Sequence, residues 1–501
     1  CFVDDITLPD MLHAAVLRSP HAHAAIRSVD TAPAGDLPGV VSVVTGEDIA
    51  GVLKDIPTRT VIAEQAVEGM KIPEHPILAK GRVCYVGQPV AIVAARNARL
   101  AEDALESIRV DYEPLPPLLD PRAASREDAP IVHRELGTNV AIRVCQQGGD
   151  LKAAFTRADH VISQRYEAQR LSPVPLETRG VIAQYSPKED LLTVWDSTQA
   201  PHRLRGYLSL LLDRPEATVR VIAPDVGGSF GVKDCIFPED VLVPYLSVLL
   251  KRSVKWVEDR QEDMLAYHGR GQSLDIEIAV TRDGEILGMR VCIVADLGAY
   301  FLLTTPSAPL NICRRITGPY RIPALRVELQ GVVTNKTPTG AYRGTGGPEA
   351  AFCMERTIDL IAGDLGLDPA VVRTRNFIPP DALICIFDFN EDIKVKGQFN
   401  YLLAGRQTSY LSDIAGFTDI ENKQSSGWGV DFTVDYNLTD KTSLYSFYRH
   451  WDIDRSDTAT GTFSGILIFQ AFEPSYGRVG CAKLTLLRRI RSTGQKSMQF
   501  Y

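Results

Sequence analysis

Several signals that mark common classes of site are missing from this chain of 501 residues. Its nine cysteines include no C-x-x-C pair, which argues against a disulfide framework, a zinc site and an iron-sulfur site. No stretch is apolar enough to cross a bilayer as a helix, and no signal-peptide pattern opens the chain. A net charge of -8 argues against nucleic acid as a partner. We therefore expect a cytoplasmic protein with reduced thiols.

Two glycine-rich loops are the most informative feature that is present. The first, residues 226–233, reads VGGSFGVK and lies between an apolar strand-like segment, 218–224, and a predicted helix over 239–250. The second, residues 341–349, reads AYRGTGGPE and opens a predicted helix over 350–362. Neither loop has the G-K-[ST] ending of a Walker sequence or the G-x-G-x-x-G spacing of a dinucleotide fingerprint. Both loops fit an anion cradle, and a purely structural turn is the alternative for each.

Several segments in the right order resemble the molybdopterin-binding large subunits of the xanthine dehydrogenase, aldehyde oxidase and aerobic carbon monoxide dehydrogenase family. Residues 2–23 and 85–95 are similar to the start and middle of that family's small α/β hammerhead domain. The two glycine loops are similar to its cofactor loops. The resemblance extends from about residue 2 to about residue 381.

The resemblance and the composition together divide the chain into five parts. They are a hammerhead-like domain over 1–120, a linker over 121–147, a first molybdopterin-binding domain over 148–382, an aromatic-rich β segment over 383–475 and a basic tail over 476–501. Strand-like patterns occur at 161–167, 180–185, 191–195, 273–281 and 286–295. The expected fold class is α+β, with an α/β hammerhead domain, a cofactor domain and a C-terminal antiparallel β segment.

The resemblance implies an oxidoreductase that hydroxylates an aldehyde or an N-heterocycle at a molybdenum-molybdopterin centre. The pterin, for which the cytosine dinucleotide form is one candidate, holds the metal in this family, so no protein side chain is expected as a metal ligand. The family passes electrons to an iron-sulfur small subunit and an FAD-binding medium subunit. Because neither module occurs in this sequence, the resemblance implies a hetero-oligomer.

The resemblance also assigns site residues. It implies cofactor contacts from Gln199, Gly228, Phe230, Gly231 and Arg343. The Gln199 amide would donate to an oxygen ligand of molybdenum, and the Arg343 backbone amide would lie beside that oxygen. We expect the two loops to meet in space, so that their main-chain donors surround one group.

Other positions bear on the substrate. Asp234 stands where purine-oxidising relatives present a glutamate, so Asp234 and Arg343 are candidate substrate-side residues. Thr345 replaces the phenylalanine that stacks on a purine, and Gly344 stands where the carbon monoxide branch carries its copper-binding cysteine. Glu177 matches a family motif and is interpreted as structural. No complete catalytic set is present.

The last quarter of the chain has a different character. Pro474 is the only proline beyond residue 382, and half of the aromatic residues lie there. Period-two alternation predicts strands over 428–436 and 443–452, joined by a turn at 437–441. Such hairpins resemble pieces of an outer-membrane barrel, and a soluble β-meander explains them equally well.

The Gly-x-Gly-Glu sequence that carries the family's base is absent. We therefore expect a chain truncated at both ends, joined to an unrelated C-terminal segment and inactive alone. The alternatives are a non-catalytic subunit-interaction protein and a chimeric fragment with a barrel-like tail.

Overall fold

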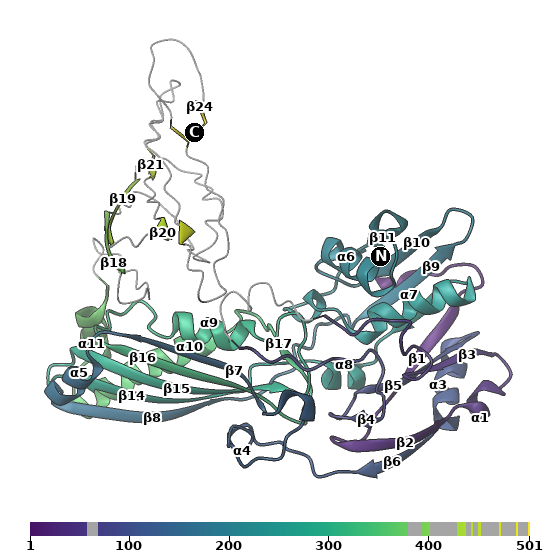
Figure 1. Ribbon diagram of the computed structural model, residues 1–501, viewed down its shortest axis with the longest axis horizontal. Coiled ribbons are helices and arrows are strands. Elements are labelled where there is room, and N and C mark those ends of the chain that lie inside the picture. Colours follow the sequence, from purple (N-terminus) through teal and green to yellow (C-terminus); the bar gives the residue numbers. More distant parts are fainter. Residues whose placement is uncertain are drawn as a thin grey trace. The chain divides into compact units, whose positions relative to one another are not determined.

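The computed structural model of the chain describes residues 1–57 and 69–378, together with short strands beyond residue 392. The chain divides into two units, and the larger one comprises residues 1–146, 151–318 and 324–369. Figure 1 shows the elements of the described residues. Within that part of the chain, every helix is too short or too polar to span a bilayer.

A seven-stranded sheet forms one part of the larger unit. Its order is β11 (Val219–Ile222), β10 (Leu191–Asp196), β9 (Gly180–Ser186), β12 (Val254–Val257), β1 (Leu12–Arg18), β5 (Pro89–Ala95) and β3 (Val40–Thr45). Strand β1 pairs in parallel with β12, so that Leu12 lies opposite Val254. Strands from the predicted hammerhead domain and from the predicted cofactor domain therefore share one sheet.

Strand β5 explains why this sheet is covered on both faces. All of its residues, which read PVAIVAA, are buried. Because side chains alternate between the faces of a strand, Ile92 joins one core cluster and Val93 joins another. Helix α7 (Pro238–Leu250) packs over the first face, and α3 (Ala98–Ser107) packs over the second. A strand that is apolar throughout is typical of such double coverage.

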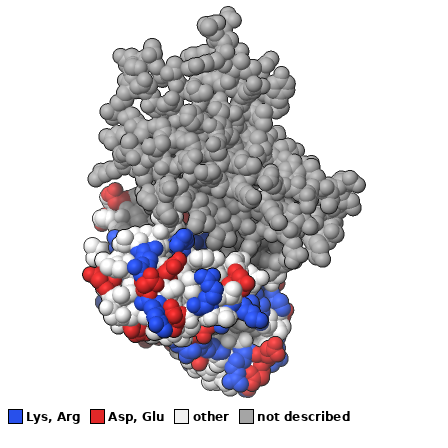
Figure 2. All heavy atoms as spheres, turned by 90° about the vertical axis from the view of Figure 1, so that its left-hand side faces the viewer, with Lys and Arg blue, Asp and Glu red and all other residues white. Residues whose placement is uncertain are grey.

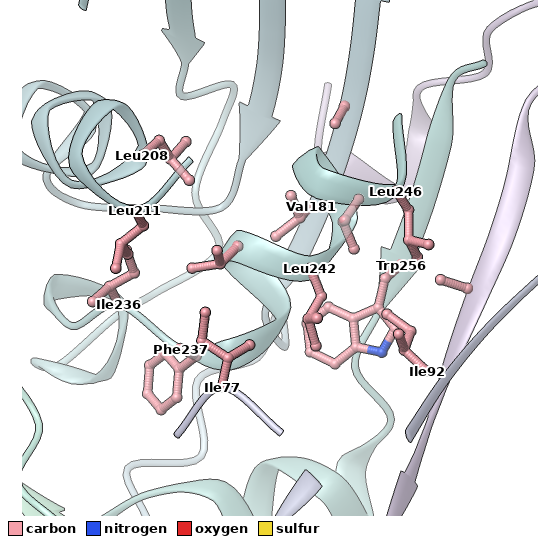
Figure 3. Close-up of a cluster of buried hydrophobic side chains, with 14 of the residues drawn as sticks. Ile77, Ile92, Val181, Leu208, Leu211, Ile236, Phe237, Leu242, Leu246 and Trp256 are labelled. Atoms are coloured by element: carbon pink, nitrogen blue, oxygen red, sulfur yellow. The ribbon is translucent and has the colours of Figure 1, made fainter. Parts of the chain in front are cut away.

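The larger of these clusters also contains α6 (Pro201–Leu211). Figure 3 shows Leu211 of α6 beside Ile236, with Leu242 of α7 beside Trp256. Each fully buried leucine or isoleucine contributes about 1.5–3 kcal/mol relative to an exposed one. This core fixes the start of α7, and with it the end of the first glycine loop.

A second sheet has five strands and separates an apolar face from a polar one. Its order is β7 (Val140–Gly148), β16 (Leu325–Val333), β15 (Ile286–Gly298), β14 (Gln272–Val280) and β8 (His160–Ala168). Along β14, Leu274 and Ile276 are buried, whereas Asp275 between them pairs with Arg165 of β8 at 2.6 Å. Strand β14 pairs antiparallel with β8 and β15, whereas β15 pairs in parallel with β16. The alternation along β14 is typical of antiparallel strands with one solvated face.

Two helices cover the apolar side of this sheet, α9 (Ser307–Arg315), which packs on β16, and α10 (Gly347–Leu365), which packs on β8. Helix α5 (Leu151–Arg157) packs on β15 from the polar side, where Phe155 lies beneath the Arg290 guanidinium. Figure 2 shows the side of the molecule that carries α5 and β8, where basic and acidic side chains are interspersed. Pairs such as Arg290 with Glu277, at 2.6 Å, explain this mixture of charges.

Shorter elements complete the described part. The three-stranded sheet contains β4 (Arg82–Val83), β2 (Ala24–Asp30) and β6 (Arg109–Pro114), and β13 (His268–Gly269) pairs with β17 (Thr339–Gly340). The remaining α-helices are α1 (Ala32–Gly35), α4 (Pro121–Ala124), α8 (Arg260–Ala266) and α11 (Pro369–Asn376), and 3-10 turns occur at Val3–Asp5, Arg134–Leu136, Glu216–Thr218 and Val232–Asp234. The second glycine loop follows β17 directly.

Beyond residue 392 the structure describes only strands. They are β18 (Ile393–Asn400), β19 (Trp428–Tyr436), β20 (Thr442–Ser443), β21 (Arg449–Trp451), β22 (Gln470–Ala471), β23 (Leu487–Arg488) and β24 (Gln499–Phe500). Strand β19 coincides with the strand predicted over 428–436 and pairs antiparallel with β18 and β21. The predicted turn at 437–441 lies outside the described residues, as does most of the predicted basic tail.

Candidate functional site

The two glycine loops lie against each other. The Arg343 amide donates a hydrogen bond to the Phe230 carbonyl at 2.9 Å. A Cβ placed on Gly231 would lie 2.0 Å from the Ala341 carbonyl oxygen, so only glycine allows this approach. The prediction that Phe230 and Arg343 meet in space is confirmed.

The first loop presents a set of unpaired main-chain donors. In the part of the chain that the structure describes, the amides of Gly228, Ser229, Phe230 and Gly231 have no protein acceptor. Positive φ values occur at Gly228 (97°), Phe230 (53°) and Gly231 (113°). Successive N–H groups in such a bend form a concave anion-binding site. Phe230 is strained there, because a bulky residue seldom adopts positive φ.

Gln199 lies next to the same loop, in the segment between β10 and α6. Its backbone amide donates to the Lys233 carbonyl at 3.1 Å, and its side-chain oxygen accepts a hydrogen bond from the Ser229 hydroxyl. Because Ser229 binds the oxygen, the NH₂ group of Gln199 is left to donate to another group. The orienting role of Ser229, which replaces a glycine often found in the family, was not identified from the sequence.

Asp234 is engaged by a cation. Arg203 of α6 binds its carboxylate at 2.6 Å, and both side chains are partly buried. The sequence identified Asp234 as a substrate-side candidate but did not identify Arg203. A signal was available, because Arg203 lies just after Pro201 in a segment whose leucines recur at helical spacing.

Arg343 contacts Phe230 through its side chain as well. Its guanidinium carbon lies 5.3 Å from the centroid of the Phe230 ring. Both side chains are exposed. Since the Arg343 amide already donates to Phe230, the part of Arg343 that remains for a ligand is its positive charge.

Buried charges lie at the start of α7, directly after the first loop. Glu239 contacts Arg179 at 3.0 Å and Arg18 of β1 at 2.6 Å. Burial acts to raise the pKa of Glu239, but the two guanidinium groups outweigh it and lower the pKa to about 2. Burial raises the pKa of the neighbouring Asp240 to about 7 despite the attraction of Arg179. Two adjacent carboxyl groups therefore have opposite pKa shifts.

Comparison with known proteins places this arrangement in a family. Residues 1–116 match the aldehyde oxidase and xanthine dehydrogenase a/b hammerhead domain, and residues 132–377 match the molybdopterin cofactor-binding domain. The nicotinate dehydrogenase large molybdopterin subunit of Eubacterium barkeri is 32% identical over 380 residues, covering 75% of this chain and 84% of that protein. The chain belongs to the xanthine dehydrogenase and aldehyde oxidase family. The predicted family and the predicted α+β fold class are thereby confirmed.

Longer members of the family are also similar to this chain. The nicotine 6-hydroxylase large subunit of Paenarthrobacter nicotinovorans is 39% identical over 383 residues, which are 75% of this chain and 46% of that protein. The crystal structure of quinoline 2-oxidoreductase from Pseudomonas putida 86 superposes with a TM-score of 0.73 at 38% identity, covering 76% of this chain and 48% of that one. This member of the xanthine dehydrogenase and aldehyde oxidase family thus spans about half the length of these two relatives.

The structure brings the site residues that the family resemblance assigned to one place. Gln199 contacts Ser229, and Phe230 contacts Arg343. Asp234 directly follows the first loop and pairs with Arg203. The contacts of these residues with a cofactor remain a prediction.

Proposed function

We propose that the two loops form part of the molybdopterin site of a molybdenum hydroxylase-type oxidoreductase. The observation that carries the proposal is the set of unpaired amides at 228–231 beside the NH₂ donor of Gln199. An oxygen-rich, anionic group would satisfy all of these donors together. When bound, the cofactor supplies oxygen transfer to a substrate carbon and takes up two electrons.

Each residue has a defined task in this proposal. The amides of residues 228–231 and the side-chain NH₂ group of Gln199 would hold oxygen atoms of the cofactor. The Arg343 guanidinium adds positive charge at the rim. The pterin holds the metal, so no side chain of this chain is assigned as a metal ligand.

For the substrate we propose an aldehyde or a nitrogen heterocycle. Two similar proteins are named for nicotine and quinoline. In this chain Asp234 is paired with Arg203, so that position offers a substrate no free carboxylate. Thr345 has no ring to stack on a purine. Both features favour an aldehyde or another nitrogen heterocycle over a purine.

The proposal includes partner subunits. Relatives include a gamma subunit of a dehydrogenase complex and a carbon monoxide dehydrogenase large chain, which supports a hetero-oligomer. We assign the electron acceptors to an iron-sulfur small subunit and an FAD-binding medium subunit, and the pterin to the cytosine dinucleotide form. The cysteines among the described residues are free thiols, which supports a cytoplasmic location.

We further propose that these 501 residues alone give little turnover. The family's base belongs to a Gly-x-Gly-Glu sequence, which does not occur in them. A positioned base typically contributes about 10²- to 10⁴-fold to a rate. We therefore expect this chain to bind the cofactor without rapid catalysis, so the two properties need separate measurements.

Metal and pterin content test the proposed site. The chain is purified from cells that make the cofactor, and molybdenum and pterin are measured per polypeptide. Gln199→Ala removes the side-chain donor and should lower both about tenfold, since a hydrogen bond to a charged group contributes about 1.5–3 kcal/mol. Gln184→Ala, at an exposed glutamine of β9, should keep the wild-type content. A wild-type chain without molybdenum and pterin would favour a non-catalytic subunit-interaction protein instead.

A further inference from the structure

Glu177 joins the first glycine loop to its neighbours. Its Oε2 atom accepts hydrogen bonds from the Ser197 hydroxyl at 2.7 Å, the Gly227 amide at 2.7 Å and the Lys233 ammonium group at 2.8 Å. In return, the Glu177 amide donates to the Gly227 carbonyl at 3.1 Å. One carboxylate oxygen therefore connects the segment after β10 with both ends of the first glycine loop.

This cluster is shielded from water. The Lys233 side chain is fully buried, and that of Glu177 keeps 17% of its accessible surface. Burial acts to raise the pKa of Glu177, but its hydrogen bonds, that from Lys233 foremost, lower it. Burial lowers the pKa of Lys233. If either charge were removed, the other would be left buried without a counter-ion, which is strongly unfavourable.

The backbone around Glu177 is shaped by this contact. A Cβ on Gly227 would lie 2.5 Å from the Cβ of Glu177, so the two segments approach as closely as glycine permits. Val174 and Phe230 both have positive φ, at 44° and 53°. Non-glycine residues keep such conformations only where surrounding contacts impose them. Glu177 lies three residues after Val174, and it is hydrogen-bonded to Gly227 of the loop that contains Phe230.

We propose that Glu177 is a positioning residue that fixes the first glycine loop and Gln199 in one arrangement before a ligand binds. Ser197 precedes Gln199 by two residues, and the Lys233 carbonyl accepts the Gln199 amide. Two hydrogen-bond partners of Glu177 are therefore connected to Gln199, Ser197 through the chain and Lys233 through a hydrogen bond. The identity of the ligand rests on the proposed molybdopterin site, whereas the positioning itself does not.

Glu177→Gln tests the proposal, because it keeps an oxygen acceptor and removes the charge. Amide hydrogen exchange is measured on the full chain without added cofactor. Exchange should accelerate about tenfold or more at Gly227 and Gln199, since hydrogen bonds to a charged acceptor are the stronger ones. Amides of β14 and β15 should keep their wild-type rates. Ser197→Ala leaves no buried charge unpaired and should accelerate the same two amides about threefold.

Asp296→Asn is a matched control. The Asp296 carboxylate also accepts hydrogen bonds from a glycine amide, a hydroxyl and a guanidinium group, which belong to Gly298, Thr334 and Arg170, and it forms an ion pair with Lys336. None of these residues belongs to either glycine loop. This variant should lower the midpoint of thermal unfolding and leave exchange at Gly227 and Gln199 unchanged. It separates positioning of the loop from general stabilisation.

Pterin content of the same preparations tests the function separately. Wild type should retain pterin, and Glu177→Gln should retain about tenfold less. The positioning role would be overturned if Glu177→Gln left exchange at Gly227 and Gln199 at the wild-type rates. It would also be overturned if Asp296→Asn accelerated exchange at these two amides as much as Glu177→Gln does. Accelerated exchange together with a wild-type chain that lacks pterin would support positioning and reject the molybdopterin site. If Glu177→Gln does not fold, exchange at Gly227 and Gln199 in Ser197→Ala tests the positioning role in its place.

Discussion

The two glycine loops have similar compositions but use their main-chain amides differently. In the second loop, the amides of Arg343, Thr345 and Gly347 all donate to nearby carbonyls. In the first, the consecutive amides at 228–231 have no acceptor among the described residues. The Arg343 amide of the second loop therefore supports the first loop, and, within the described part of the chain, the unpaired amides of the second loop alternate with paired ones. Of the two, only the first loop offers a consecutive row of donors to a ligand. A glycine-rich composition indicates that the backbone closely approaches another group. It does not indicate whether that group is another part of the protein or a ligand.

The helices that follow the loops also differ. In the first turn of α10, Glu349 pairs with Arg270 at 3.0 Å, and Arg270 also lies over the Tyr342 ring. In the first turn of α7, Glu239 pairs with Arg179 and Arg18, and burial raises the pKa of the neighbouring Asp240. The first turn of α7 therefore adds to its ion pairs a carboxyl group that holds its proton more tightly than usual.

Gly231→Ala should have the largest effect on this arrangement. The new Cβ would lie 2.0 Å from the Ala341 oxygen at a φ of 113°. We expect the free energy of unfolding, measured in urea, to fall by about 3 kcal/mol or more. Gly363→Ala in α10, where a Cβ meets nothing within 4 Å, should instead raise it by about 0.5–1 kcal/mol. Similar losses in both variants would contradict the loop contact.

Asp240→Asn should change how stability depends on pH. The pKa of Asp240 is about 7 in the folded protein and 3.8 ordinarily, so the folded state keeps a proton that the unfolded chain releases. The stability that this group contributes is present below about pH 4 and is lost as the pH rises to 7. Asparagine removes that loss, so the decline between pH 4 and 7 should shrink by about 3 kcal/mol. Urea titrations at several pH values measure it, and an unchanged decline would show that Asp240 is ionised throughout.

Ser229→Ala should have the smallest effect. It removes the hydroxyl that orients Gln199, and we expect the free energy of unfolding to fall by about 1 kcal/mol. Thr345→Ser is the counterpart in the second loop, where the hydroxyl makes no hydrogen bond within the described residues. That change should stay within about 0.5 kcal/mol. An equal loss from both variants would mean that Ser229 does not hold Gln199.

Much of the local structure could be predicted from the sequence. The helix expected over 239–250 is α7, and the one expected over 350–362 lies inside α10. Both succeed because local signals agree: proline near the first turn of each, an apolar run, and Gly366 with positive φ at the end of α10. Helix α6 was missed, although Leu204, Leu208 and Leu211 recur at helical spacing.

The sheet partners and the support of the site could not be predicted. Nothing local to Leu12 indicates that it pairs with Val254. In the same way, Glu177 was expected to be structural, but its donors come from separate segments. Family resemblance identified Gln199 and Arg343, because their types and neighbours match known motifs. It could not show that Arg203 neutralises Asp234, because that contact depends on the rotation of a helix.

The pairing of β1 with β12 sets an order of events during synthesis. Strand β1 leaves the ribosome long before β12 exists, and at about 5–20 residues per second this interval is on the order of tens of seconds. Throughout it, the edge of β1 that β12 later covers is open to strands of other nascent chains. The polypeptide is therefore most exposed to misassembly before its second glycine loop has been translated.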